Sequence, residues 1–377
     1  MLVSIVIINY NNASDTIECL ESLLNLSYIP FNIIIIDNNS LDDSCKKITQ
    51  WADGNFSLSI AGDLKKISSP PAKKPLAYVM YHYSDGIFSK ESENTDKNKS
   101  ALTIIKSAKN LGFAGANNIG VKFALKHYSP AYFWFLNNDT VVEKNALSEM
   151  IDLSQKDKEI GCIGSKIIYY DKPELLQYAG GAEKILTHGT TDQKGQPSSN
   201  FSEDREIAGY ITGTSFLIKK EIINRAGLWD ENFFLSVEDV DYSERIKKSG
   251  YKLFFSAKSL VYHKDGSSSK RKITIKKFLW TKSERINIKS FYTIGYYDLR
   301  NWIYFNKKHR LKKLSAKLFY YFLFIPYLFL GTITYIIRYD DYKLLRIKCV
   351  IKAFIDGFLN RLGFREPLKE FQNIKYE

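Results

Sequence analysis

The chain has 377 residues, too many for one average domain and too few for three, and 45% of them are apolar, enough for a sizeable core. Its four cysteines form no C-x-x-C pair, which argues against a zinc ribbon or a disulfide framework and favours a reducing cytosol. The net charge of +13 is uneven, because from Arg245 onward 30 Lys and Arg accompany 9 Asp and Glu, a balance of +21 that leaves −8 for the preceding residues. This split predicts a polyanionic partner for the last third, nucleic acid or an anionic membrane face, unless the lysines only cover a solvated surface.

The N-terminal part alternates strands and helices as a doubly wound α/β domain does. Val3–Asn9 and Asn32–Asp37 are short β-branched runs with apolar residues on both faces, typical of parallel strands covered by helices on both sides. Ser14–Leu26 has apolar residues at helical spacing, and Asp15 with Glu18 has the form of an N-terminal helix cap. A second helical stretch completes a strand–helix–strand–helix unit. The chain begins on a strand, without the features of a signal peptide, so we expect a cytoplasmic location.

Residues 54–100 are rich in glycine, proline and polar residues, and we interpret them as an insertion. Within it, Leu76–Tyr83 resembles a strand and 89–100 is expected to be a mobile tip. The α/β pattern then resumes, and we place its end at residue 268, where a serine run meets the basic helical region 269–377. The expected elements are strands at Leu102–Ser107, Tyr132–Leu136 and Tyr210–Ile218, a loop at Asn110–Asn118, and helices at about Asn117–Lys126 and from about Lys220.

Polar residues follow four of these strands. They include Asn9 and Asn11 after the first strand, Asp37 after the second, the loop Asn110–Asn118 after the third, and Asn137-Asn138-Asp139 after the fourth. Each group alone is explained by turn chemistry, since Asn and Asp are common turn residues. However, the carboxyl ends of parallel strands meet at one edge of the sheet, which is where open α/β sheets bind ligands. Together the four groups predict a ligand site.

Several side chains are candidates for catalysis or metal binding. Asp139, at the end of a buried aromatic strand, is suited to hold a divalent cation, Mg²⁺ or Mn²⁺, that bridges phosphate oxygens. Glu238, Asp239 and Asp241 fall within four residues at a helix start, which the helix macrodipole alone would favour. Because an aromatic run precedes them, we expect one of these carboxylates to be a general base. His263 follows another strand, and it is either a metal ligand or a structural residue.

Leu318–Ile337 is a run of 20 residues without a charge, long enough to cross a bilayer as a helix. Pro326 and Gly331 interrupt the run, and its aromatic residues and basic neighbours favour a segment lying in the membrane interface. The alternative is a buried helical hairpin of a soluble domain.

Six segments, in this order, resemble the inverting family 2 of glycosyltransferases: VSIVIINYNN, IIIIDNNSLDDS, NLGFAGANNIG, FLNNDTVV, ITGTSFLIKKEIINRAGLWDENFF and VEDVDYSERIKKSGYKL. The match spans about residues 1–265 and looks most like the rhamnosyltransferase-type branch that builds bacterial surface polysaccharides. The segment YYDLRNWIYFNKKH at 296–309 is also similar to that branch. The resemblance implies an α/β GT-A fold, in which a Rossmann-like nucleotide-binding half and an acceptor half share one mixed sheet, here followed by the basic helical region.

The resemblance also implies roles for the residues at matching positions. Asp37 would contact the nucleotide base, and Asp139 would be the last residue of the family's D-x-D metal motif. The first position of that motif is Asn137 here, so a metal would have one carboxylate fewer and would depend more on His263. Asp239 matches the catalytic base, supported by Glu238 and Asp241. The remaining donor-side residues would be Asn9, Asn11, Asn110, Gly112, Asn118, Asn137 and Asn138, and the acceptor-side residues Thr212, Gly213, Thr214, Trp229 and Asp230.

These features predict an inverting glycosyltransferase that uses a divalent metal at the inner face of the membrane. It would move a sugar, rhamnose by resemblance, from a dTDP- or UDP-linked donor to a saccharide or lipid-linked acceptor of a surface polysaccharide. The Q-x-x-R-W motif of processive relatives does not occur, which favours single additions. The alternative is a non-catalytic scaffold at the membrane surface. A nucleic-acid binder fits less well because the tail has no base-reading motif, and a glycoside hydrolase would leave the strand ends unexplained.

Overall fold

The structure is a computed structural model that describes residues 1–58, 63–94, 102–181, 193–264, 276–278, 281–283, 295–337 and 342–365. These residues form two compact units. The first unit contains the described residues up to Asp230 and those from Asp239 to residue 264. The second unit contains Glu231–Glu238 and the described residues from 276 onward, so it is more than a C-terminal extension.

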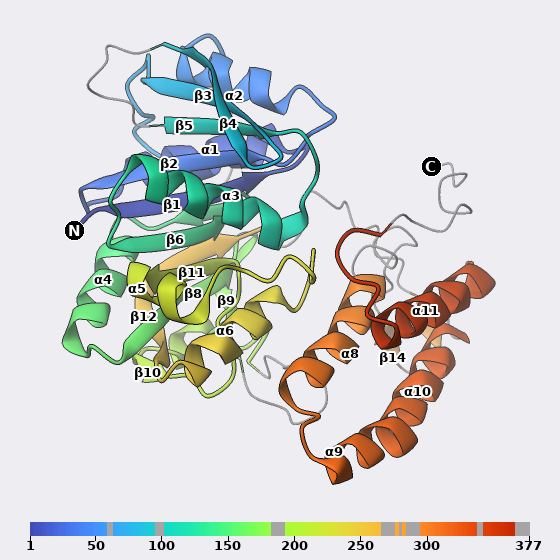
Figure 1. Ribbon diagram of the computed structural model, residues 1–377. Coiled ribbons are helices and arrows are strands. Elements are labelled where there is room, and N and C mark those ends of the chain that lie inside the picture. Colours follow the sequence, from blue (N-terminus) through green and yellow to red (C-terminus); the bar gives the residue numbers. More distant parts are fainter. Residues whose placement is uncertain are drawn as a thin grey trace. The chain divides into compact units, whose positions relative to one another are not determined.

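A mixed sheet of 12 strands forms the centre of the first unit (Figure 1). The order along its main path is β10-β12-β8-β11-β6-β1-β2-β5-β3-β4, with β7 paired to β12 and β9 paired to β8. The strands are β1 (Val3–Asn9), β2 (Phe31–Asp37), β3 (Tyr78–Ser84), β4 (Ile87–Glu93), β5 (Leu102–Ser107), β6 (Tyr132–Asn137), β7 (Thr140–Val142), β8 (Ile160–Tyr169), β9 (Lys172–Tyr178), β10 (Arg205–Glu206), β11 (Ser215–Lys219) and β12 (Lys252–His263).

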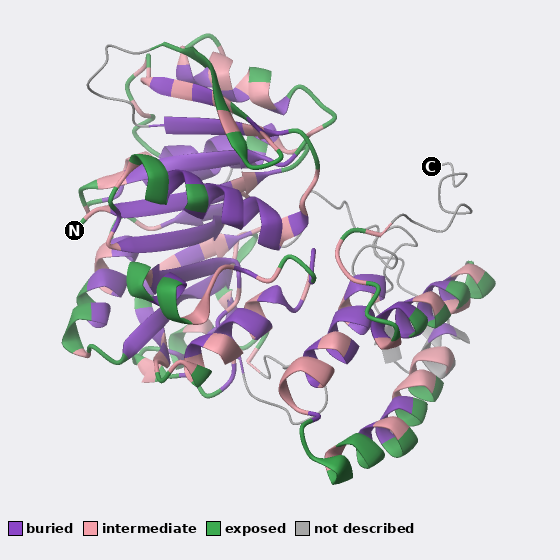
Figure 2. Cartoon of the chain, in the orientation of Figure 1, coloured by how far each residue is buried: buried purple, intermediate pink, exposed green. Residues whose placement is uncertain are grey.

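Strands β6, β1, β2 and β5 are mutually parallel, as the apolar β-branched runs predict. Ile33, Ile34, Ile35 and Ile36 of β2 are all fully buried, so both faces of the strand are covered (Figure 2). The four polar strand ends therefore lie at one edge of the sheet, as expected. Beyond β6 the direction changes, because β11 runs antiparallel to both β6 and β8.

Helices cover both faces of this sheet (Figure 1). Side chains of α1 (Ala13–Leu24), α2 (Ser44–Ala52) and α4 (Ala146–Lys156) belong to one buried apolar cluster. Those of α3 (Gly112–His127), α5 (Lys220–Ala226) and α6 (Glu238–Lys248) belong to the other. Two short 3₁₀ helices, Asp63–Lys66 and Ser198–Asn200, lie outside these layers. The α/β prediction for this region is confirmed.

Several predicted local features are wrong. The cap of α1 is Asn12, whose side chain accepts the N–H of Asp15, because an acid inside the first turn cannot cap its own helix. The expected loop Asn110–Asn118 is mostly helix, since α3 already begins at Gly112. Part of the expected mobile tip is strand β4, and 95–101 lies outside the described residues. The strand expected at Tyr210–Ile218 begins only at Ser215.

The regular elements described in the second unit are helices and two three-residue strands, β13 (Lys276–Phe278) and β14 (Thr281–Ser283). Its helices are α8 (Tyr297–His309), α9 (Leu314–Phe319), the π-helical turn Tyr320–Phe324, α10 (Ile325–Ile337) and α11 (Lys343–Phe358). Pro326 does not break the apolar run, contrary to expectation. The π-turn directly before it provides the altered hydrogen-bond pattern that a residue without an N–H requires.

Candidate active site

The first part of the site lies where β1 and β2 end. Asn9 and Asp37 are partners in the parallel register, and Asn9 Nδ2 donates to Asp37 Oδ1 at 2.7 Å. Ser40 holds the same carboxylate through its hydroxyl at 2.6 Å and its N–H at 3.2 Å. Asn9 is fully buried, and its Oδ1 accepts a hydrogen bond from Thr16. Asn9 therefore orients Asp37, and its place on the donor side stays a prediction.

Asparagines tie together the loops that follow these strands. Asn11 has a left-handed backbone, with φ 53°, and its Oδ1 accepts the N–H of Leu41 at 2.7 Å. Asn38 donates to Asn110 Oδ1 at 3.0 Å and to the carbonyl of Gly112 at 3.2 Å. Asn38 belongs to the polar group after the second strand that helped predict a ligand site, but no individual role was predicted for it. It links the end of β2 to the start of α3.

Asn118 lies six residues beyond Gly112 along α3 and is buried. Its amide makes a two-way bond with the backbone of Trp229, donating to the carbonyl at 2.9 Å and accepting the N–H at 3.0 Å. The Trp229 ring is buried among aromatic residues that include Phe113, with ring centroids 5.6 Å apart. Asn118 thus holds the chain at Trp229 in place, and its predicted place in the donor site stays a prediction.

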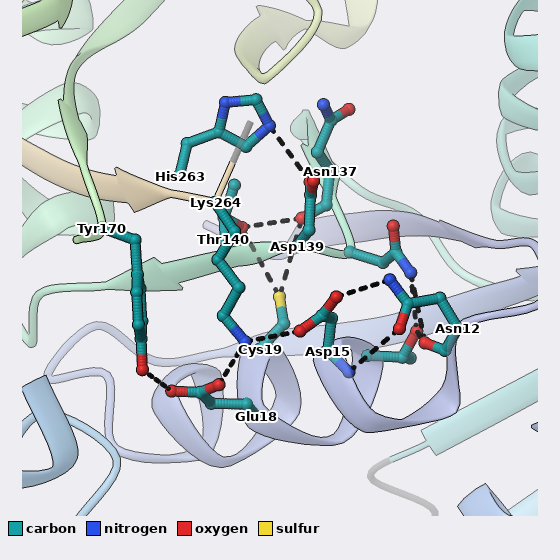
Figure 3. Close-up of polar contacts among 12 residues, drawn as sticks. Asn12, Asp15, Glu18, Cys19, Asn137, Asp139, Thr140, Tyr170, His263 and Lys264 are labelled. Carbon is teal, nitrogen blue, oxygen red and sulfur yellow. Dashed lines mark hydrogen bonds and ion pairs between the residues drawn. The ribbon is translucent and has the colours of Figure 1, made fainter. Parts of the chain in front are cut away.

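Asp139 and His263 lie next to each other, at the ends of β6 and β12 (Figure 3). His263 Nε2 is 3.1 Å from Asp139 Oδ1, and both side chains are 10% exposed. His263 Nδ1 is 2.7 Å from Gln177 Oε1, so Nδ1 carries the hydrogen and the Nε2 lone pair of a neutral ring faces the carboxylate. Two acceptors facing each other need a proton or a cation between them.

Asp139 and His263 therefore fit a divalent cation chemically, since imidazole nitrogen and carboxylate oxygen are both ordinary ligands. Within the described ranges, no group of three or more His, Cys, Asp or Glu side chains is arranged to hold a metal. Asn137 is half-buried, and its amide lies on the same side as the His263 ring (Figure 3). Asn138 instead donates to Thr16 at 2.9 Å. A metal here would need further ligands, such as water or substrate oxygens.

A buried charge cluster supports this pair from α1 (Figure 3). Lys264, the residue after His263, donates to the carboxylates of Asp15 and Glu18, and its backbone N–H donates to the Asp139 carbonyl at 3.0 Å. Burial lowers the pKa of Lys264, but its bonds to the two carboxylates outweigh this and raise the pKa overall. Burial raises the pKa of the nearby Cys19 thiol to about 12, which keeps it protonated at neutral pH. The sequence reasoning missed this cluster because it assigned Asp15 and Glu18 to a helix cap.

The second part of the site lies at the start of α6. Asp239 Oδ2 accepts the backbone N–H of Gly213 at 2.9 Å, and Oδ1 accepts the N–H of Val240 at 2.8 Å. Two backbone donors fix the orientation of this half-buried carboxylate. A Cβ at Gly213 would come within 2.9 Å of the Phe113 ring, so the close approach requires glycine. Thr212 and Thr214 flank it, with their hydroxyls 3.3 Å apart.

The other predicted residues of this part differ in exposure. Asp241 is fully buried and pairs with Arg245 at 2.8 Å, which gives it a structural role in α6. Glu238 is buried, and Asp230 is half-buried at the last position of the first unit before the Glu231–Glu238 segment. Asp239 is thus the carboxylate of the cluster that is both oriented and partly accessible.

The mixed sheet, with acids at the carboxyl ends of its parallel strands and a second acid on α6, is the GT-A architecture of glycosyltransferases. The family model for glycosyl transferase family 2 matches residues 4–60 and 90–227. The chain belongs to glycosyl transferase family 2 and is a glycosyltransferase.

The chain is also similar to individual proteins. The chain is 26% identical over 159 residues to the O-antigen biosynthesis protein RfbC of Myxococcus xanthus, a match over 39% of this chain and 12% of that protein. Among solved structures it is similar to the mannosyltransferase PcManGT of Pyrobaculum calidifontis in complex with GDP-Man and Mn²⁺, with 13% identity, TM-score 0.50, and coverage of 95% of this chain and 87% of that chain. It is also similar to GalNAc-T7 with UDP, GalNAc and Mn²⁺, with 16% identity, TM-score 0.51, and coverage of 95% and 56%. At these identities the structures establish the shared fold alone.

Proposed function

We propose that this glycosyltransferase is inverting and non-processive, and that it transfers a sugar from a nucleotide-diphosphate donor to a saccharide or lipid-linked acceptor of a surface polysaccharide. The observation that carries the proposal is the contact between Asp139 and His263. It lies at the edge of the sheet where β2 ends with Asp37. Rhamnose is the proposed sugar on the sequence resemblance, and dTDP or UDP is the proposed carrier. The similarity to an O-antigen biosynthesis protein supports a polysaccharide product.

On the donor side, Asp37 would accept a hydrogen bond from the imide N–H of uracil or thymine. Asn9 and Ser40 already hold its carboxylate in one orientation. Donor binding would therefore lose little side-chain entropy at Asp37. Asp139 and His263 would hold a divalent cation, which when bound neutralises the charge that develops on the departing diphosphate. Lys264 secures both of their strand ends to α1 through Asp15 and Glu18.

On the acceptor side, Asp239 would take the proton of the attacking hydroxyl. A general base must lie within hydrogen-bond reach of that proton, and fixed geometry contributes more than flexible contact. The Gly213 and Val240 N–H groups donate to the two oxygens of this carboxylate and fix its orientation. The oxygen would attack the anomeric carbon from the side opposite the diphosphate, which inverts that centre.

Donor hydrolysis by the purified protein tests this function. We expect Mn²⁺- or Mg²⁺-dependent release of nucleotide from dTDP-rhamnose, or from one member of a panel of nucleotide sugars, because glycosyltransferases often transfer slowly to water when no acceptor is present. Metal chelation should abolish the release. If no nucleotide sugar of the panel is hydrolysed and calorimetry detects no donor binding, the result contradicts the proposed activity. It would favour the alternative of a non-catalytic scaffold at the membrane surface.

We also propose that the second unit associates with the anionic inner face of the cell membrane. In the described residues, Leu314–Ile333 is a helix long and apolar enough to cross a bilayer, and 17% of an apolar 18-residue window within it is buried. Its outward side chains are large and apolar, and Lys312, Lys313 and Lys317 lie at its start. The exposed apolar residues are Leu314, Leu318, Phe319, Phe322, Leu323, Tyr327 and Leu330 (Figure 2). Aromatic residues beside lysines favour an interfacial position.

Flotation with liposomes tests this association. The wild-type protein is expected to float with vesicles of phosphatidylglycerol and phosphatidylcholine, and less so at high salt. Phe322→Ser with Leu323→Ser should reduce the bound fraction several-fold, because each removes well-exposed apolar surface. Ile87→Ser in β4, where the side chain is similarly exposed, is the control and should float normally. Absence of flotation on anionic lipid, or salt-sensitive binding to duplex DNA instead, contradicts the membrane proposal.

A further inference from the structure

One face of α8 holds the Glu231–Glu238 segment within the second unit. Tyr304 packs on Phe233 and Tyr297 packs on Phe234, each pair with ring centroids 5.1 Å apart. Between these two tyrosines lie two fully buried polar side chains. The four residues recur at intervals of three and four, the spacing that places side chains on one face of a helix: Tyr297, Arg300, Asn301 and Tyr304.

Asn301 is bound to the backbone of the segment. Its Nδ2 lies 2.7 Å from the carbonyl oxygen of Phe233, 2.8 Å from that of Leu235 and 2.7 Å from that of Ser236. Its Oδ1 accepts from Arg300 Nε at 2.8 Å and Nη2 at 2.7 Å. The guanidinium therefore fixes which end of the Asn301 amide faces the segment.

Arg300 itself binds the start of the segment. Its Nη2 donates to the carbonyls of Asn232 at 3.2 Å and Phe233 at 3.0 Å, and Nη1 donates to the carbonyl of Gly363 at 2.7 Å. In the described part of the chain, no carboxylate lies within ion-pair distance of this fully buried cation. Burial lowers the pKa of Arg300, and the nearby Tyr296, Tyr297 and Asp356 only partly offset this, so burying the charge is unfavourable for packing alone. Its fork of donors suits the task of fixing several carbonyls at once.

The backbone that these residues hold is strained. Phe234, Ser236 and Val237 all have left-handed φ values, 61°, 72° and 70°. Such a conformation is an outlier for a β-branched residue such as Val237. Strained backbone persists only where its surroundings over-determine it. Ser236 adds a side-chain bond to Asp298 of α8 at 2.9 Å.

We propose that Arg300 and Asn301 are positioning residues for Asp239. The segment they hold ends at Glu238, which is the first residue of α6 and is joined to Asp239 by a peptide bond. By holding the strained backbone at Ser236 and Val237, Arg300 and Asn301 restrain the residues that immediately precede Asp239 in the chain. The inference rests on the proposed function, because it takes Asp239 as the general base.

The test compares two buried asparagines of the same helix. Asn301→Ala removes the bonds to the segment, whereas Asn306→Ala removes an equally buried amide that bonds the Trp302 carbonyl within α8. Two quantities are measured: donor hydrolysis of dTDP-rhamnose, or of the sugar the panel selects, and amide hydrogen exchange of peptides covering 231–239. We expect Asn301→Ala to lower hydrolysis by about 10- to 100-fold and to speed exchange of those peptides. Asn306→Ala should change neither, and both variants should bind dTDP as the wild type does.

A double-mutant cycle separates positioning from general stability. If Asn301 acts through Asp239, Asn301→Ala has no further effect on the rate in an Asp239→Asn background. Arg300→Lys and Ser236→Ala are the milder variants if Asn301→Ala does not fold, and each should give a smaller loss in the same cycle. Equal losses for Asn301 and Asn306, additive losses in the cycle, or a loosened segment with an unchanged rate overturn the proposal. A wild-type protein that binds dTDP but hydrolyses no donor contradicts the proposed function instead.

Discussion

Asp239→Asn is expected to lower turnover by about 10²- to 10⁴-fold, the usual contribution of a general base. The amide keeps the shape of the side chain, and its carbonyl oxygen can still accept one of the two backbone N–H bonds from Gly213 and Val240. It cannot take a proton from an acceptor hydroxyl. Donor affinity should be unchanged, because Asp37, Asp139 and His263 belong to other strand ends. Steady-state kinetics with the selected donor, together with calorimetric titration of dTDP, measure the two effects separately.

Glu244→Gln is the matched control for this variant. Glu244 also lies on α6, where it pairs with Lys247 at 3.2 Å and Lys248 at 3.1 Å. Turnover should be within about twofold of wild type, because surface ion pairs contribute little. A variant at Asp239 that turns over normally but binds donor weakly would reverse the assignment and place Asp239 on the donor side.

The fold was predictable from the sequence because the first half follows simple periodicities. Runs such as Ile33–Ile36 have no polar face, which only a strand with helices on both sides tolerates. The parallel order then brought Asn9, Asp37 and Asp139 to one edge without further information. The pattern did not reveal how Asn9 is used, since a fully buried asparagine that orients an acid and one that binds a ligand have the same place in sequence.

Contacts between distant segments were not predictable, and they make up much of the site. Asn118 meets Trp229 across 111 positions of the chain, and Lys264 meets Asp15 across 249. The positive φ of Val237 has no signature in composition, because glycine is the residue that normally marks such a backbone. The start of α3 at Gly112 was missed because the glycines of this segment suggested a loop. Glycine has a low helix propensity, but here the helix packs on the sheet, with Gly120 against Val6, and this packing outweighs the propensity.

Asp139→Asn and His263→Ala are each expected to weaken Mn²⁺ binding by at least about 100-fold, since losing an outer partner of a ligand already costs 10- to 100-fold. Each change also removes one side of the acceptor pair whose atoms are 3.1 Å apart. Gln177→Ala, which removes the acceptor that fixes the His263 tautomer, should fall in that smaller 10- to 100-fold range. Calorimetric titration of Mn²⁺ in the presence of dTDP gives these affinities without any need for turnover.

The control for the metal variants is His82→Ala, which removes an exposed histidine of β3 and should leave Mn²⁺ affinity unchanged. Metal-dependent turnover should fall in step with affinity and recover partly at high Mn²⁺ for His263→Ala, where the Asp139 carboxylate remains. If Asp139→Asn and His263→Ala both bind Mn²⁺ as the wild type does, the 3.1 Å contact is a structural ion pair with a protonated imidazole. In that case other groups would have to neutralise the donor diphosphate. Lys264, whose ammonium pairs with Asp15 and Glu18, would be the first residue to substitute in testing this.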